Sequence, residues 1–192
     1  IDGTPVLPGV MSMEGFAEAA LLALPGWRVA AVEDVEFVAP FKVYRDQPRV
    51  ATIEVRLHPQ GDDEVVADCA LLGTRTLPGR DEPQATTHAT GRVRMQCAAL
   101  APAAGPEPRA PRGIPVVASE LYSVFFHGPA YRVLSSTWKD GEAVGGRMAE
   151  DLPEDHDVSA GPVVHGPRLA ALCFQGPGGR ELGVEGRTAL PP

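Results

Sequence analysis

The chain has 192 residues, of which 44% are hydrophobic and 22% are charged. This is an ordinary balance for a globular protein with a sizeable core. The net charge of −8 argues against general nucleic-acid binding, which needs a positive surface, and gives no attraction to anionic membranes. No apolar run approaches the roughly 18 residues of a membrane span. We therefore expect a cytoplasmic domain that binds neither nucleic acid nor membrane.

The cysteine pattern argues against a disulfide framework or a zinc site. The three cysteines, Cys69, Cys97 and Cys173, form no C-x-x-C pair and are odd in number. We expect them to be small buried residues in a reducing compartment. The acidic run around His156 has no second ligand cluster, so no metal is predicted there.

The first half of the chain predicts one helix and an antiparallel sheet. After an entry loop over residues 1–9, apolar side chains recur at three- and four-residue spacing from Val10 to Leu24, the pattern of a helix with one apolar face. Apolar residues alternate with polar ones over 51–57 and 92–97, and 65–72 is a more continuous apolar run. These are typical of strands with one buried face, with a turn at 60–63.

The second half follows a Pro/Ala-rich linker at 99–115. The apolar segments 121–126, 131–138 and 143–148 predict a second sheet. A short helix begins at Pro167 and should end at the Gly/Pro run 176–179. The outline is two α+β units, residues 1–98 and 119–192, joined by 99–118. The chain starts without Met and ends abruptly at Pro192, so we expect it to be part of a longer polypeptide.

Several short motifs occur in a family's order along the chain. Gly3 and Pro8 have the spacing of G-x-x-x-x-P in the motif H-x-x-x-G-x-x-x-x-P, and Leu190-Pro191 matches a later L-P segment. Residues 126–131 are similar to Y-G-P-x-F, with His127 for Tyr and Tyr131 for Phe. Residues 167–175 resemble D-x-x-x-Q or E-x-x-x-Q, with Gln175 last. The chain thus resembles the dehydratase domains of iterative polyketide synthases, in versions closest to the enediyne-type and polyunsaturated-fatty-acid synthases.

The resemblance implies a double hot-dog fold, α+β, in which each half wraps a curved antiparallel sheet around a central helix. Strands are expected to be missing at both ends. The implied partners are an acyl carrier protein and other synthase domains, and a homodimer is compatible with the family. The domain needs no cofactor of its own, because the carrier's phosphopantetheine holds the substrate. The implied substrate-binding residues are Gly3, Pro8, Gly9, Val10, His127, Gly128, Pro129, Tyr131 and Gln175.

The reaction implied is removal of water from a 3-hydroxyacyl thioester. It needs a base for the α-proton, an acid for the leaving hydroxyl, and a donor for the thioester oxygen. A backbone N–H at Gly9 or Val10, at a helix N-terminus, could be that donor. The family's base falls on the second residue upstream of Ile1, and its acid position is Ala171. The catalytic residues are therefore unassigned, and the alternatives are an active dehydratase, a silent dehydratase-like scaffold or a hot-dog thioesterase.

The five histidines of the chain offer one candidate for substrate contact. His127 lies in a loop that lines the acyl tunnel in the family, although it could also serve only to satisfy a turn backbone. His58 and His88 fall in phase with polar strand residues, so we expect both on the surface. We expect His165 in a helix-entry loop and His156 in a solvated loop.

Overall fold

The computed structural model describes residues 3–44, 48–75, 82–98, 114–154 and 161–185, with side chains described as far as 178. The chain divides into two compact units, residues 1–103 and 104–192, and each is described by itself. Of the predicted linker, 99–118, the structure describes only residues 114–118, and the predicted boundaries of the two halves stay a prediction.

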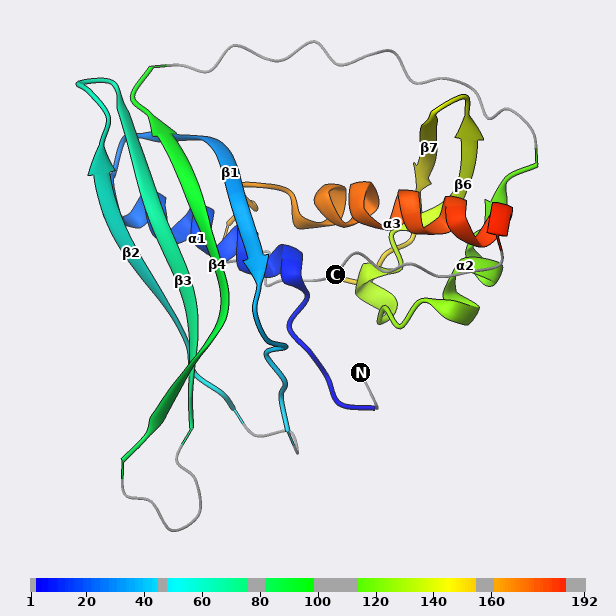
Figure 1. Cartoon of the computed structure of the whole chain (residues 1–192), viewed down its shortest axis with the longest axis horizontal. Helices are drawn as coiled ribbons and strands as arrows, with labels where there is room; N and C mark the ends of the chain where they lie inside the picture. Colours follow the sequence, from blue (N-terminus) through cyan, green and yellow to red (C-terminus); the bar gives the residue numbers. More distant parts are fainter. Residues whose placement is uncertain (1–2, 45–47, 76–81, 99–113, 155–160, 186–192) are drawn as a thin grey trace. The chain divides into compact units, whose positions relative to one another are not determined.

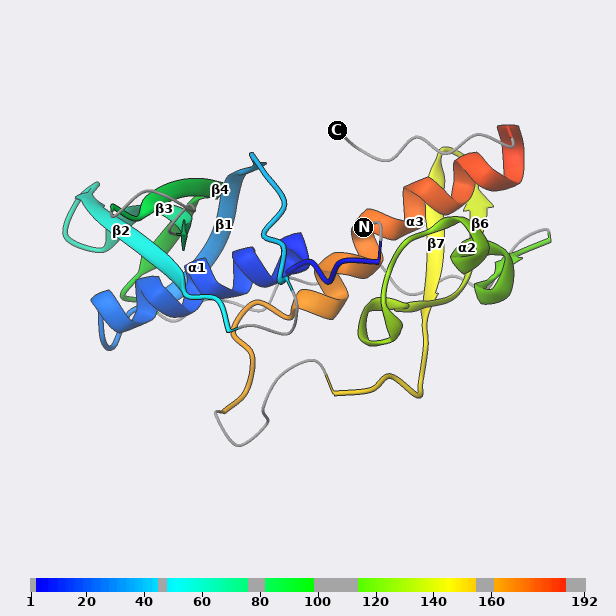
Figure 2. The ribbon, with the colours of Figure 1, turned by 90° about the horizontal axis from the view of Figure 1, so that it is seen from below.

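The first unit is a helix packed on a four-stranded sheet (Figure 1). Its elements are α1 (Gly9–Ala23), β1 (Arg28–Phe37), β2 (Ala51–Pro59), β3 (Glu64–Arg75) and β4 (Gln84–Gln96). The strand order is β1-β4-β3-β2, and every neighbouring pair is antiparallel. Helix α1 contacts all of these strands, and Figure 2 shows it lying along one face of the sheet. The predicted first helix, its burial and its antiparallel partners are confirmed.

Apolar periodicity places the core of this unit between α1 and the sheet. The helix buries Val10, Met13, Phe16, Ala17 and Ala20. In β3, buried residues alternate with partly exposed ones along the strand, as the pleat requires. The predicted turn at 60–63 joins β2 to β3, where the Gln60 N–H donates to the Glu64 carbonyl at 2.9 Å. The buried strand residues that complete the core are Val65, Ala67, Cys69, Leu71, Ala89, Val93 and Met95.

Strand β1 had no clear signal in the sequence. Its pairing with β4 is interrupted twice, between Val29 and Ala31 and between Glu33 and Glu36. Asp34 at the second irregularity has a positive φ of 50°. Each irregularity breaks the two-residue alternation by which a strand is recognised.

His88 is buried, so its predicted place on the surface is wrong. Leu71 pairs with Ala89 while Leu72 pairs with Thr87, which leaves His88 as an extra residue in β4. Such a bulge reverses the phase of the strand on one side of it. His88 and Ala89 are consequently both buried, with 5% and 1% of their surface exposed.

The second unit combines a three-stranded sheet with helices. Its elements are β5 (Val116–Val117), α2 (Ala118–Val124), the 3₁₀ turn η1 (Pro129–Tyr131), β6 (Leu134–Asp140), β7 (Ala143–Met148) and α3 (Pro167–Glu185). The sheet order is β5-β6-β7, antiparallel throughout. The predicted sheet segment 121–126 is instead mostly helical, because the Glu120 carboxylate accepts the Val117 N–H at 3.1 Å and supports a helix start.

Helix α3 does not end at the Gly/Pro run, so its predicted length is wrong. It contacts all three strands of the sheet and continues through Pro177. A proline inside a helix removes one N–H donor, and the carbonyl that loses its partner belongs to Cys173. Cys173 is exposed, so water can bind that carbonyl. The Thr137 hydroxyl lies 3.5 Å from the Gly176 carbonyl, which links the helix to β6 at this point.

Cysteine burial follows the prediction at only one position. Cys69 is buried, whereas Cys97 and Cys173 are exposed. Cys97 follows the last residue of β4, and its thiol donates to Asp63 Oδ1 at 3.0 Å. Cys173 lies about 200° around α3 from Ala171, which is buried. In the described part of the chain, no helix is long and apolar enough to cross a membrane.

Candidate functional site

The predicted site residues of the first unit form the entry to α1. The Leu7 N–H donates to the Phe41 carbonyl at 3.0 Å, and the Val43 N–H donates to the Pro5 carbonyl at 2.9 Å. Val6 and Lys42 form a bridge between these bonds. Gly3 has a φ of +72°, a conformation that favours glycine. The entry segment is therefore paired with residues 41–43.

The N-terminus of α1 carries backbone donors. Pro8 precedes the helix and supplies no side-chain cap, and its carbonyl accepts the Met11 N–H at 2.9 Å. The N–H groups of Gly9 and Val10 lie in the first turn, where a helix offers no acceptor. Phe37 packs so closely on Gly9 that a Cβ there would lie 2.7 Å from the ring. Donors in this position can stabilise a developing negative charge.

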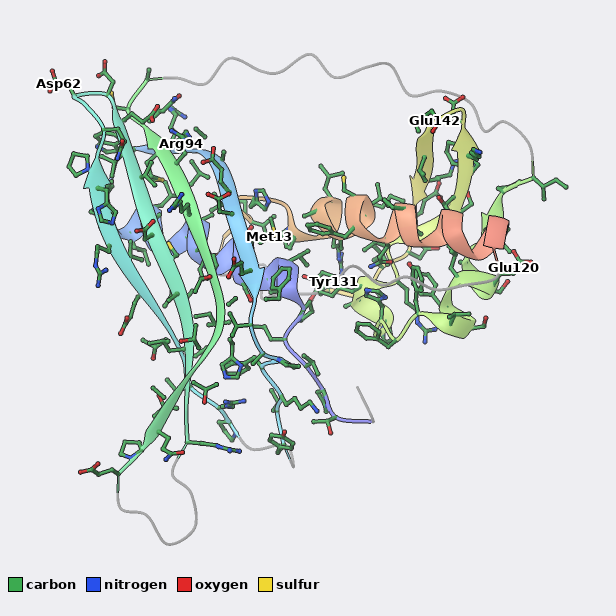
Figure 3. The ribbon with its side chains drawn as sticks, in the orientation of Figure 1. Met13, Asp62, Arg94, Glu120, Tyr131 and Glu142 are labelled. Carbon is green, nitrogen blue, oxygen red and sulfur yellow. The ribbon has the colours of Figure 1, made fainter. Side chains whose placement is uncertain are left out.

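The predicted site residues of the second unit are joined by Gln175. The Gln175 amide Nε2 donates to the Tyr131 carbonyl at 3.0 Å, and the Tyr122 hydroxyl donates to Gln175 Oε1 at 2.8 Å. The same hydroxyl accepts the Leu134 N–H at 2.8 Å. Gln175 is 4% exposed and Tyr131 is 7% exposed; Figure 3 labels Tyr131. This network ties α2, η1 and β6 to the buried face of α3.

His127 has a buried polar atom. Its Nδ1 is buried and makes no hydrogen bond to any residue that the structure describes, while its ring stacks on Phe126 with centroids 4.9 Å apart. Burial lowers the pKa of His127, which favours the neutral imidazole. Its carbonyl accepts the Arg132 Nε–H at 3.1 Å. A buried nitrogen that lacks a partner is available to a bound ligand.

Gly128 and Pro129 shape the turn that follows His127. The Gly128 carbonyl accepts the Tyr131 N–H at 3.0 Å, and Pro129 opens η1. The turn is also bound to the start of α3, because the Arg168 Nε–H donates to the Ala130 carbonyl at 3.2 Å.

Ala171 occupies the buried face of α3. Pro167, Ala171 and Gln175 are spaced by four residues, so they share one side of the helix, and Ala171 is 4% exposed. A carboxyl group at this position would be surrounded by protein and held in its protonated form by desolvation. The helix face suits an acid, although this chain places a methyl group there.

The structure brings His127, Gly128, Pro129, Tyr131 and Gln175 together in the second unit, and the Gly3–Val10 stretch forms one entry segment in the first. That the two groups meet at one acyl site stays a prediction. Tyr122 was missed, because nothing near it in the sequence signals its bond to a residue on another helix.

Of the other described histidines, His58 and His165 lie away from this network. His58 Nε2 lies 3.0 Å from Asp68 Oδ2 and is partly exposed. His165 lies in the loop before α3, and His156 lies outside the described residues. Among the described residues, no group of histidine, cysteine, aspartate and glutamate side chains is arranged to hold a metal ion.

Solved structures that are similar to this chain include dehydratase domains of polyketide synthases. The dehydratase domain from the CurF module of curacin polyketide synthase has a TM-score of 0.69 and 17% identity, covering 91% of this chain and 62% of that chain. The dehydratase domain of RzxB from Pseudomonas fluorescens has a TM-score of 0.68 and 20% identity, covering 99% and 67%. The dehydratase-cyclase domain in ambruticin biosynthesis has a TM-score of 0.60 and 25% identity, covering 94% and 61%.

These comparisons confirm the double hot-dog fold. The chain spans about three fifths of the length of two of these structures, 62% and 61%. No protein-family model and no curated protein matches the chain. The chain is thus similar in fold to polyketide synthase dehydratase domains.

Proposed function

We propose that the chain belongs to a dehydratase domain of a polyketide or fatty-acid megasynthase, in versions closest to the enediyne-type and polyunsaturated-fatty-acid synthases. Its substrate would be a 3-hydroxyacyl thioester on the phosphopantetheine of an acyl carrier protein, and its product the enoyl thioester. The observation that carries the proposal is the Gln175 network, because it fixes the motif-bearing turn 127–131 to the buried face of α3. The fold likeness over 91% and 99% of this chain supports it.

The residues present supply binding and orientation for this reaction. The N–H groups of Gly9 or Val10 would donate to the thioester oxygen as the α-proton leaves. The neutral ring of His127, with its unpartnered Nδ1, would contact the substrate. The base is expected upstream of Ile1. The leaving hydroxyl would need a proton that the methyl group of Ala171 does not supply.

A silent dehydratase-like domain is the second candidate, and Ala171 is the observation that favours it. Such a domain would hold the acyl chain without removing water. The buried network around Gln175 would then serve to maintain the fold, and the turn at 127–131 would serve only to bind.

Incubation with a short 3-hydroxyacyl pantetheine thioester tests the proposal, with formation of the conjugated enoyl thioester as the readout. The unmodified chain should show no useful rate, because a positioned acid or base each contributes roughly 10²–10⁴-fold. A chain lengthened upstream to include the expected histidine should gain little alone. Adding Ala171→Glu to it should raise the rate, since burial keeps the new carboxyl protonated.

Ala171→Gln in the same lengthened chain is the matched control, because it adds a similar volume without an acid. Equal rates in the Glu and Gln variants would support the silent domain. Robust turnover by the unmodified chain would show that the acid and base are misassigned. Release of free pantetheine thiol without enoyl formation would indicate the hot-dog thioesterase instead.

A further inference from the structure

The first unit contains a partly buried side-chain group that none of the recognised motifs includes. Arg49, His88 and Phe41 come from three separate segments: the stretch before β2, the bulge in β4 and the stretch after β1. Arg49 NH2 lies 3.1 Å from His88 Nε2. The Arg49 guanidinium also lies 4.2 Å from the centroid of the Phe41 ring, and Phe41 meets the His88 ring edge-on at 4.9 Å.

The hydrogen bonds fix the tautomer of His88. A guanidinium only donates, so Nε2 must accept from Arg49. The ring proton is then on Nδ1 and is donated to the Ala39 carbonyl at 3.1 Å. Arg49 in turn donates from NH1 to the Lys42 carbonyl at 2.8 Å. Both side chains therefore bind the backbone of the 39–42 stretch.

That stretch holds the entry to α1. Phe41 accepts the Leu7 N–H, and the Val43 N–H binds Pro5, so a displacement of 39–43 would move the segment that ends at Pro8. The space between Gly73 of β3 and the Arg49–His88 pair is too small for an added side chain. A Cβ on Gly73 would lie 2.6 Å from both Arg49 NH2 and His88 Nε2, which shows how tightly β3 encloses the pair.

We propose that Arg49 and His88 are positioning residues for the Gly3–Pro8 segment: they fix the 39–43 stretch and, through it, the donors at the start of α1. The consequence for an acyl thioester rests on the proposed function, whereas the positioning itself does not. The bulge at His88 is then a functional feature of β4, because only that extra residue turns the imidazole inward.

Amide hydrogen exchange of the full chain tests the proposal without any substrate. In Arg49→Met, the Leu7 and Val43 amides should exchange about tenfold faster, which corresponds to about 1.4 kcal/mol, because the partly buried hydrogen bonds from a charged donor are lost. The Val93 amide in the sheet should be unaffected. Arg56→Met, on the exposed side of β2, is the matched control and should leave all three amides unchanged.

Two histidine variants separate the bonds of the pair. His88→Gln can place an amide oxygen near the Nε2 position and should keep Leu7 and Val43 protected. The shorter side chain of His88→Asn can reach the Ala39 carbonyl but not Arg49, so the Leu7 and Val43 amides should lose their protection. Nitrogen NMR of the native chain should show the Nδ1–H tautomer of His88. The proposal would be overturned if the Leu7 and Val43 amides exchanged at unchanged rates in Arg49→Met, or if the Val93 amide were accelerated equally. An Nε2–H tautomer of His88 would overturn it as well. If Arg49→Met does not fold, Arg49→Lys replaces it: its single ammonium cannot replace both the NH1 and the NH2 bond, so the Leu7 and Val43 amides should still exchange faster while Val93 does not.

Discussion

The Tyr122 hydroxyl donates to Gln175 Oε1 at 2.8 Å although 53 residues separate the two in the sequence. The same hydroxyl accepts the Leu134 N–H, so its proton has only one direction. That direction makes the amide orientation of Gln175 unambiguous and leaves its Nε2 to bind the Tyr131 carbonyl. One phenol thus orders the side chain that secures the turn at 127–131.

Replacing Tyr122 by phenylalanine should lower the free energy of unfolding by about 1–3 kcal/mol, because the Leu134 N–H and Gln175 Oε1 lose a shared partner. Urea denaturation followed by circular dichroism measures this. Tyr44→Phe, at a residue with 53% of its surface exposed, is the control and should have little effect. Equal stability of the two variants would show that the network contributes little to the fold.

The partly buried ring of His127 predicts a dependence of stability on pH. Its pKa is lowered by burial, so the unfolded chain binds the proton more readily than the folded one. Stability is then complete above the unfolded value of about 6.5 and falls as the pH drops from there toward the folded pKa. His127→Phe should flatten this fall in urea denaturation between about pH 7 and pH 5. A slope identical to that of the native chain would contradict the burial argument.

An ion-pair network on the face of the sheet opposite α1 predicts an effect at lower pH. Arg94, labelled in Figure 3, donates to both carboxylate oxygens of Glu33 at 2.9 Å. Its hydrogen bonds and charge lower the pKa of Glu33 from 4.5. The stability that this ion pair contributes is fully present above the pKa of Glu33 in the unfolded chain. It is lost as the pH falls through the pKa of Glu33 in the folded chain.

Arg94→Gln should therefore raise the pKa of Glu33, as followed by carboxyl-carbon NMR. Arg56→Gln, on β2, which pairs with neither β1 nor β4, should leave the titration of Glu33 as it is. A Glu33 titration that does not move in Arg94→Gln would mean that the bidentate contact is not populated in solution.

The cysteines should differ in their reaction with an aromatic disulfide reagent. Burial raises the pKa of Cys69 to about 11, so this thiol should react only on unfolding. The hydrogen bond to Asp63 raises the pKa of Cys97. Asp63→Ala should therefore speed labelling of Cys97, whereas Asp62→Ala at the adjacent exposed turn residue should not. Fast labelling of Cys69 in the native chain would contradict its placement in the core.

The sequence predicted the elements whose periodicity is unbroken. Helix α1, strand β2 and the part of β4 that follows the bulge keep a regular apolar pattern, so their buried faces could be predicted from it. Strand β1 and the burial of His88 could not be predicted from the pattern, because bulges reverse the alternation and depend on the register with a neighbouring strand. Helix α3 was predicted too short, since Pro177 removes only a bond at an exposed position.

The candidate site was assembled from short motifs, and the contacts that join distant segments around it were missed. Gln175 and the turn at His127 could be recognised from local residues. Tyr122, Arg49 and His88 could not be recognised in this way, because each forms a hydrogen bond to a distant part of the chain. Arg49 and His88 are 39 residues apart, and Tyr122 and Gln175 are 53 residues apart. Local pattern carries no information on such pairs.

The most direct test of the account is a titration of the chain with a nonreactive 3-hydroxyacyl pantetheine amide, followed by backbone amide NMR. The proposed function assigns both groups to one acyl ligand, so it predicts that the Gly9 and Val10 amides and the His127 and Tyr131 amides shift together along one saturation curve. Pantetheine without the acyl group should shift them less. Saturable shifts that are confined to one group of amides, or to the sheet face opposite α1 around Arg94, would contradict the proposal of one acyl site.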